Sequence, residues 1–323
     1  MVPLLLASCG SDMVSSADDI VTTGVPIGFS CLDNDNNADA RPTRGSQVTT
    51  ETGIGSFIVN ARYYQTSGGA PVDYLHNQTV SYNTAATTWT YTPQRYWPST
   101  GEIDFFAYSP AAPKGTIESL TLRHDGYPDW MLRYNVKNPV ITSINELEGS
   151  SLSADVWAKA CDAENQEDLL LSINPQVSCA DQTAGSKVAL HFLHALAGLR
   201  FQFAGTYSFP EGTTHVILAV APLSTGGTIS MNRATGTDTS PTITWSLDES
   251  EATYYQAYTL SADHKLSTDG MTFFLPPQTL KNFTVIARFY KQENGTYTHL
   301  ATKSSKKINI TLQRAQTTTV TIE

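Results

Sequence analysis

Apolar and polar residues alternate along most of the chain with the period of a β-strand. The alternation is clearest in residues 57–63, 88–92, 188–192 and 283–289. Successive side chains of a strand point to opposite faces, so this pattern gathers the apolar residues on one face. A continuous apolar run at 103–108 predicts a strand that is buried on both faces. Because turn signals separate many short segments of this kind, the chain is predicted to be all-β.

Two further segments carry predicted elements. Residues 154–171 are the best helix candidate, centred on Ala154 to Ala163 and resuming at Asp168 to Leu171. Residues 136–144 are predicted to form a further strand. A single helix among so many strands does not change the predicted fold class.

The length of 323 residues predicts about two domains. Polar and small residues at 180–186 predict the boundary, which gives an N-terminal domain at 46–185 and a C-terminal domain at 186–323. Short strands with turns between them are typical of sandwiches and barrels, so each domain is expected to be one or the other.

Charge excludes one class of partner. The chain has 20 Lys and Arg against 30 Asp and Glu, a net charge of −10. No basic stretch accumulates that would follow a phosphate backbone, so nucleic acid is not an expected partner. The longest apolar run, at the N-terminus, is far shorter than the roughly 20 residues of a membrane-spanning helix.

The N-terminus resembles the end of a bacterial lipoprotein signal. Leu6-Ala7-Ser8-Cys9 fits a lipobox, and polar residues follow at once. In this interpretation residues 1–9 are a truncated signal, and the Cys9 thiol carries a diacylglycerol that anchors the precursor to the outer membrane. The alternative is an apolar N-terminus with a chance cysteine.

The other cysteines are Cys31, Cys161 and Cys179. Cys161 and Cys179 lie 18 positions apart, so a disulfide between them is one prediction and two thiols are the other. A bridge closing a loop of that size would stabilise the fold by about 3 kcal/mol. No C-x-x-C motif is present, which leaves a zinc ribbon or a redox site without support.

Residues 10–45 are predicted to be a segment distinct from the first domain. They contain a strand whose apolar face is formed by Val25, Ile27, Phe29 and Cys31. A polar linker that includes Arg41 and Arg44 follows it. Exposed linkers of this composition are preferred sites of proteolysis.

Motifs that carry chemistry are almost absent. Asp33-x-Asp35-x-Asn37 begins like a calcium loop, but the required Gly and Glu are missing, so a polar linker is the better interpretation. His191 and His194 would face opposite sides of a strand and are poor candidates for one metal. No catalytic or cofactor-binding motif occurs, so no cofactor is expected and an enzyme is the weakest hypothesis. An aromatic platform for sugars remains as an alternative, formed by Tyr96, Trp97, Tyr127 and Trp130.

Six short patterns in order resemble the Bacteroidales fimbrillin family of type V pilus proteins. They are the lipobox, the first strand with its linker, Gly55 to Tyr63, Trp89 to Pro110, Asp168 to Ala197, and Phe273 to Gln278. The resemblance implies two β-sandwich domains of transthyretin-like topology. It also implies export as a lipoprotein and cleavage by an Arg-specific surface protease after Arg44, or alternatively after Arg41.

In that family, cleavage discards the first strand and opens an apolar groove that a strand of the next subunit fills. The apolar residues of the first strand and the exposed linker favour the same sequence of events. The candidate donor strand is the alternating C-terminal segment, with apolar residues Ile308, Ile310, Leu312, Val320 and Ile322.

The expected function is therefore a structural or adhesive subunit of a surface fimbrium, with other pilus subunits as partners. Stalk, tip and anchor roles stay open, and so does the host or bacterial receptor. The alternative is a cell-surface lipoprotein that binds glycans and does not polymerise.

Overall fold

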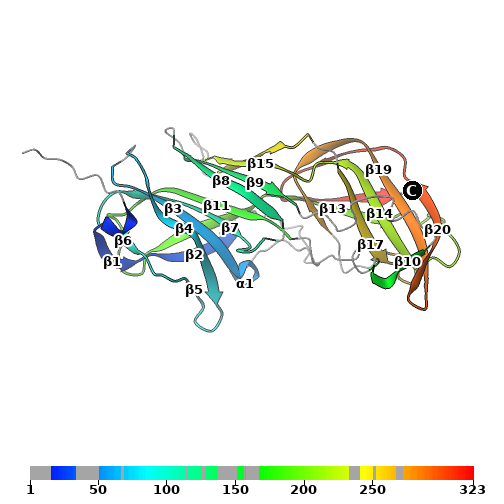
Figure 1. Cartoon of the computed structure of the whole chain (residues 1–323), viewed down its shortest axis with the longest axis horizontal. Coiled ribbons are helices and arrows are strands. Elements are labelled where there is room, and N and C mark those ends of the chain that lie inside the picture. Colours follow the sequence, from blue (N-terminus) through cyan, green and yellow to red (C-terminus); the bar gives the residue numbers. More distant parts are fainter. Residues whose placement is uncertain are drawn as a thin grey trace, which may run out of the picture.

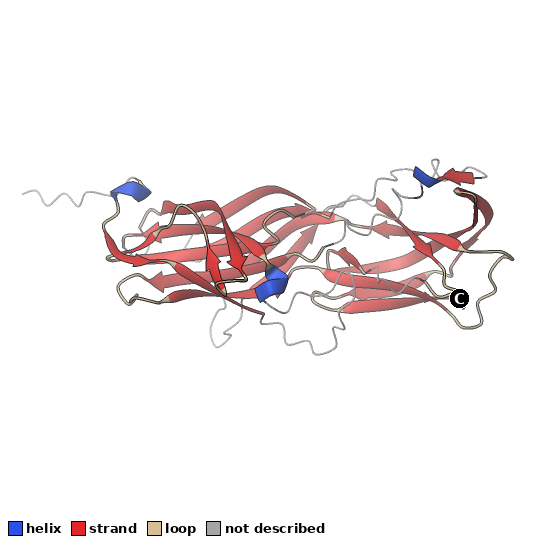
Figure 2. Cartoon of the chain, turned by 90° about the horizontal axis from the view of Figure 1, so that it is seen from below, coloured by secondary structure: helices blue, strands red, loops and turns tan. Residues whose placement is uncertain are grey.

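The computed structural model describes residues 16–33, 51–66, 69–113, 115–124, 128–136, 151–155, 157, 167–232, 241–249, 252–266 and 272–323. They form an elongated molecule with the first strands at one end and the last strands at the other (Figure 1). Nearly all elements are strands, which confirms the all-β prediction (Figure 2). The elements are η1 Ala17–Asp19, β1 Thr22–Pro26, β2 Gly28–Asp33, α1 Glu51–Ile54, β3 Ser56–Tyr64, β4 Val72–Asn83, β5 Thr88–Thr90, β6 Tyr96–Pro98, β7 Glu102–Ser109, β8 Thr116–His124, β9 Pro128–Asn135, β10 Ser151–Ser153, β11 Leu170–Ser178, β12 Lys187–His194, β13 Ala197–Phe203, β14 His215–Leu223, β15 Gly226–Asn232, β16 Thr242–Leu247, β17 Ala252–Thr259, β18 Phe273–Leu275, β19 Gln278–Glu293, β20 Thr296–Ser304, β21 Ile308–Leu312 and β22 Thr317–Ile322.

A seven-stranded sheet, ordered β2-β12-β11-β7-β3-β4-β5, surrounds the first hydrophobic core. Phe57, Val59, Ala61 and Tyr63 of β3 all point into this core, as their alternation predicts. On the neighbouring strand β7, Phe106 points the opposite way into a second cluster. β7 is therefore buried on both faces, which explains its continuous apolar run.

The C-terminal half is a sandwich of two sheets. One has the order β10-β20-β19-β14-β17, with β21 paired to β19, and the other has the order β18-β13-β22. The core between them receives Val216, Leu218 and Val220 from β14. The intervening Ile217 and Ala219 point to the outer face of the larger sheet, where another apolar cluster covers them.

The two halves exchange elements. β15 and β16 come from the C-terminal half, but they share a four-stranded sheet of order β16-β15-β9-β8, in which β15 pairs with β9. This sheet packs against the outer face of the first sheet, where Trp130 stacks on Phe106 at 4.7 Å between ring centroids. In the opposite direction, β10 pairs with β20, and nearby Trp157 stacks on Tyr297 at 4.3 Å.

The observed strands revise the end of the predicted helix and bear on the choice of domain boundary. Leu170 and Leu171 begin β11 and do not continue a helix, although Ala154, Asp155 and Trp157 are helical. β12 is hydrogen-bonded on both sides within the first sheet, so a division between 185 and 186 would separate it from its partners. We therefore propose a boundary at residues 195–196. The predicted strand at 136–144 lies outside the described residues beyond Val136, and the transthyretin-like topology stays a prediction.

Candidate functional site

The predicted first strand lies at the edge of the seven-stranded sheet. β2 pairs with β12 in parallel, from Gly28 opposite Lys187 to Asp33 opposite Phe192. Ile27 separates β2 from β1, which pairs with β6 in a small sheet of its own. The predicted strand is therefore present, but it is divided into two short strands at Ile27.

The apolar face of this segment is buried in the first core. Ile27, Phe29 and Cys31 are 1%, 2% and 3% exposed, and Val25 packs against the same core while partly buried. The ring of Phe29 lies between Phe57, Tyr91 and Phe105, at centroid distances of 5.7, 5.6 and 6.1 Å. Burying a side chain of this size stabilises a fold by about 1.5–3 kcal/mol before the cost of ordering.

The main chain of Ile27 is held by the loop between β5 and β6. Its carbonyl accepts hydrogen bonds from Tyr91 Oη at 3.0 Å and from Gln94 Nε2 at 2.9 Å. Its N–H donates to the carbonyl of Arg95 at 2.9 Å. Burial raises the pKa of Tyr91 to about 12, so its hydroxyl keeps its proton and remains a donor at neutral pH.

Further contacts tie the residues before Ile27 to the same end of the molecule. The N–H of Ser99 donates to the carbonyl of Val21, and Thr23 Oγ1 donates to the carbonyl of Trp97 at 3.1 Å. The guanidinium of Arg95 forms an ion pair with Asp18 at 2.9 Å. Because Asp18 is largely exposed, this ion pair contributes little, and the main-chain contacts and buried side chains provide most of the attachment.

The expected C-terminal donor strand closes the core of its own domain. β21 pairs with β19, and β22 pairs in parallel with β13. Leu312, Val320 and Ile322 are 1%, 4% and 2% exposed, while Ile308 and Ile310 are partly buried against the same core.

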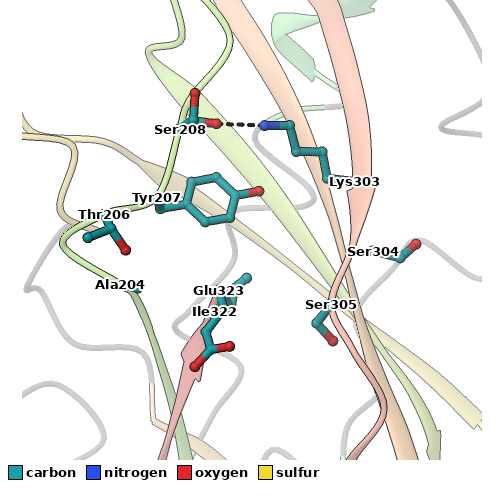
Figure 3. A pocket seen from close by; sticks show the side chains of 9 residues that line it. All are labelled: Ala204, Thr206, Tyr207, Ser208, Lys303, Ser304, Ser305, Ile322 and Glu323. Atoms are coloured by element: carbon teal, nitrogen blue, oxygen red, sulfur yellow. Dashed lines mark hydrogen bonds between the residues drawn. The ribbon is translucent and has the colours of Figure 1, made fainter.

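A cavity of about 370 Å³ lies at the end of β22, bordered by Ile322 and Glu323. Tyr207 projects into it, and Lys303 donates to the carbonyl of Ser208 at 2.6 Å across it (Figure 3). Its walls are rich in hydroxyl groups, and its shape depends on where β22 ends.

The aromatic platform for sugars is wrong. Trp97 is 0% exposed in the first core, and Trp130 is 2% exposed in a different cluster. Tyr96 is exposed on its own, and Tyr127 lies outside the described residues. Both tryptophans fill cores, so neither ring presents a face to a ligand.

One of the two strand histidines, His194, is buried against a carboxylate. His191 and His194 both lie on β12, and His194 Nδ1 is hydrogen-bonded to the carboxylate of Asp168. Within the described ranges, no three His, Cys, Asp or Glu side chains gather in a way that would hold a metal ion. In the same ranges no helix is long and apolar enough to cross a bilayer.

Several predicted residues fall in segments without a description. Cys9, Arg41, Arg44 and Cys161 lie outside the described residues. Cys179 is buried, and this burial is the main cause that raises the pKa of its thiol to about 12. Lipidation, the cleavage site and the disulfide therefore stay predictions.

Sequence reasoning missed the residues that hold Ile27. Tyr91 was visible only as part of an alternating strand, and Gln94 and Arg95 belong to no motif. Their role depends on a contact between residues 64 to 68 positions apart in the chain. No local sequence pattern predicts such a contact.

One family model and several solved structures match the chain. The fimbrillin-like family model matches residues 40–323. A putative cell adhesion protein from Bacteroides ovatus is 13% identical, with 93% of this chain and 92% of that chain covered and a TM-score of 0.49. One from Bacteroides uniformis is 16% identical, with 93% of both chains covered and a TM-score of 0.43. The fimbrial anchor protein Mfa2 from Porphyromonas gingivalis is 10% identical, with 86% and 81% covered and a TM-score of 0.29. No curated protein matches the sequence.

Proposed function

Because the chain belongs to the fimbrillin-like family, we propose that it is a structural or adhesive subunit of a type V pilus. The family implies a fimbrial location at the cell surface and other pilus subunits as partners. In this proposal the precursor is exported as a lipoprotein through Cys9. An Arg-specific protease then cuts after Arg44, or after Arg41, and the cut subunit assembles by strand exchange.

One observation carries the proposal. The segment before the linker contributes buried side chains to the first core, yet it touches the sheet only as an edge strand. Loss of this segment would leave one edge of β12 unpaired and would open to solvent the apolar pocket that Phe29 fills. An unpaired edge beside an apolar slot is a template for strand addition, in which the backbone supplies hydrogen bonds and alternate side chains fill pockets.

The donor is less well supported than the acceptor. To be donated, the C-terminal segment must leave a core in which Leu312, Val320 and Ile322 are buried. A stalk subunit has to make this change during assembly, whereas a tip subunit keeps the segment in place. An anchor would keep the first strand and its lipid, and the Arg44 site argues against that role.

Neither alternative gains a supporting observation. The glycan-binding surface lipoprotein loses its proposed platform, because Trp97 and Trp130 are buried. An enzyme lacks a catalytic constellation in the sequence, and the family match supports a structural role.

The test is processing and polymerisation of the full chain. Limited cleavage by an Arg-specific protease should yield a new N-terminus at Gly45, followed by polymers that resist mild detergent. The Arg44→Ala variant should remain a monomer, or be cut only after Arg41. Polymers from the uncut Arg41→Ala, Arg44→Ala double variant would refute activation by cleavage, and N-terminal sequencing of surface material would identify the residue that is cut.

A further inference from the structure

The loop between β5 and β6 holds one residue of the first strand, Ile27, by both its N–H and its carbonyl. We propose that Tyr91, Gln94 and the main chain of Arg95 form a peptide socket, which sets the register of the strand in the groove and retains the first strand after the linker is cut. The retention step rests on the cleavage in the proposed function, whereas the register does not.

The geometry of the socket is specific for a main-chain group. Tyr91 Oη and Gln94 Nε2 both donate to the Ile27 carbonyl, at 3.0 and 2.9 Å, and the Arg95 carbonyl accepts from the Ile27 N–H at 2.9 Å. Both polar ends of one residue are satisfied, so any strand that occupies this position must present an extended residue here. Gln94 lies at the exposed rim, while Tyr91 is half-buried and closer to the core.

Two supports of the socket come from outside the strand that it holds. Gln78 Nε2, on β4, donates to the carbonyl of Thr92 at 3.2 Å within the loop. Tyr74 Oη donates to the carbonyl of Tyr96 just beyond it. Both supports come from the first sheet, so the loop keeps these two hydrogen bonds when β2 is absent.

Tyr91 couples this socket to the next apolar pocket. Its hydroxyl binds the Ile27 carbonyl, and its ring packs against Phe29 with centroids 5.6 Å apart. The residue held by its main chain, Ile27, and the residue with the bulky side chain, Phe29, are therefore two positions apart. A slip of one residue would turn every apolar side chain of the strand to the wrong face. Holding the main chain of one residue in place therefore selects one register.

Retention follows from where the contacts lie. Every described contact of the first segment is made by residues 16–33, and both candidate cleavage sites lie beyond residue 33. Cleavage removes the covalent link and none of these contacts. The fragment should therefore stay bound until another strand displaces it.

The first experiment measures retention in the full chain after cleavage by an Arg-specific protease. The N-terminal fragment should co-elute with the remainder in size-exclusion chromatography. Tyr91→Phe should speed its dissociation about tenfold, the equivalent of one hydrogen bond worth about 1.4 kcal/mol. Gln94→Ala should speed it about threefold because this side chain is exposed, and Gln202→Ala, which removes an exposed amide on β13, should have no effect.

The second experiment measures register. The cut protein is incubated with an excess of a labelled peptide copying residues 25–33, which exchanges with the retained fragment, or with the same peptide carrying one glycine inserted between Gly28 and Phe29. The wild type should incorporate the matched peptide at least tenfold better. In the Tyr91→Phe, Gln94→Ala double variant this preference should fall to about threefold or less, whereas a merely structural role would weaken both peptides equally.

Rapid loss of the fragment from the wild type would overturn retention. An unchanged preference in the double variant, or no incorporation of the matched peptide, would overturn the register role. Polymerisation is read separately. A cut chain that retains its fragment by the socket but never forms polymers would count against the proposed function and leave the socket standing. A double variant that forms normal polymers and releases the fragment at the wild-type rate would count against the socket and leave the proposed function standing.

Discussion

His194 and Asp168 form a buried pair at the junction of the two halves of the molecule. His194 Nδ1 is hydrogen-bonded to a carboxylate oxygen of Asp168, and each side chain is 2% exposed. The carbonyl of His194 also accepts from Arg314 Nη1 at 2.7 Å. At the next residue, Trp245 Nε1 donates to the carbonyl of Ala195 at 2.8 Å. The chain thus leaves the first sheet through a point that residues from the C-terminal half hold in place.

Replacing Asp168 with alanine should lower the free energy of unfolding by about 1–3 kcal/mol, because it removes the carboxylate to which the buried His194 imidazole is hydrogen-bonded. Urea denaturation followed by tryptophan fluorescence measures the loss. Asp263→Ala is the matched control. It breaks an ion pair with Lys265 at the surface, and its effect on the free energy of unfolding should be far smaller. Equal losses in the two variants would contradict a structural role for the buried pair.

High pH should loosen the first segment through Tyr91. The pKa of Tyr91 is raised from 10.0 to about 12, mainly by burial, so the folded state favours the neutral phenol. This contribution to stability is complete below pH 10 and is lost as the pH rises toward 12, because the unfolded state gives up its proton first. Urea midpoints between pH 9 and pH 11.5 should therefore fall less steeply in Tyr91→Phe than in the wild type. Parallel slopes would show that Tyr91 does not titrate with unfolding.

Local patterns predicted the strands well because their cause is local. Alternation at Phe57 to Tyr63 and at Phe283 to Phe289 reflects a sheet with one face in a core, and both sets are buried as expected. The run at 103–108 reflects a strand covered on both faces, and Phe106 provides the second contact. The apolar face of the first strand, centred on Phe29, was visible for the same reason.

Long-range pairing was not predictable in this way. β12 follows a polar stretch that looks like a domain boundary, yet it pairs with β2, more than 150 positions earlier in the chain. Leu170 and Leu171 fit a helix as well as a strand, and hydrogen bonding to β7 and β12 decides the outcome. Trp97 and Trp130 were candidates for a platform because composition alone does not distinguish a core aromatic from an exposed one.

The disulfide between Cys161 and Cys179 is testable by mass. Both cysteines fall in the single tryptic peptide 160–187, because no Lys or Arg lies between Lys159 and Lys187. If the disulfide forms, this peptide should be lighter by two hydrogens before reduction than after it, and reduction should lower the free energy of unfolding by about 3 kcal/mol. If Cys179 keeps its thiol, it should resist alkylation in the folded protein, because it is buried and its pKa is raised to about 12. Alkylation of both cysteines at the same rate in folded and unfolded protein would contradict the burial of Cys179.

The last prediction separates core from donor in the C-terminal segment. Val320 is 4% exposed on β22, opposite Phe201 of β13, while Ile310 on β21 is only partly buried. Val320→Asp places an unpaired charge in the core and should lower the free energy of unfolding by about 4 kcal/mol or more, measured by thermal melting. Ile310→Asp should cost about 1–2 kcal/mol and leave a folded monomer. Thr319→Asp, on the exposed face of β22, is the control and should melt like the wild type.

Polymerisation of the cut protein then assigns the role of the segment. If it is donated, the folded Ile310→Asp variant should fail to polymerise, because the charge would enter an apolar pocket of the next subunit. If it stays in its own domain, as in a tip subunit, Ile310→Asp should still accept a strand from a wild-type partner. Normal melting and normal polymers from both Val320→Asp and Ile310→Asp would show that the segment is neither core nor donor.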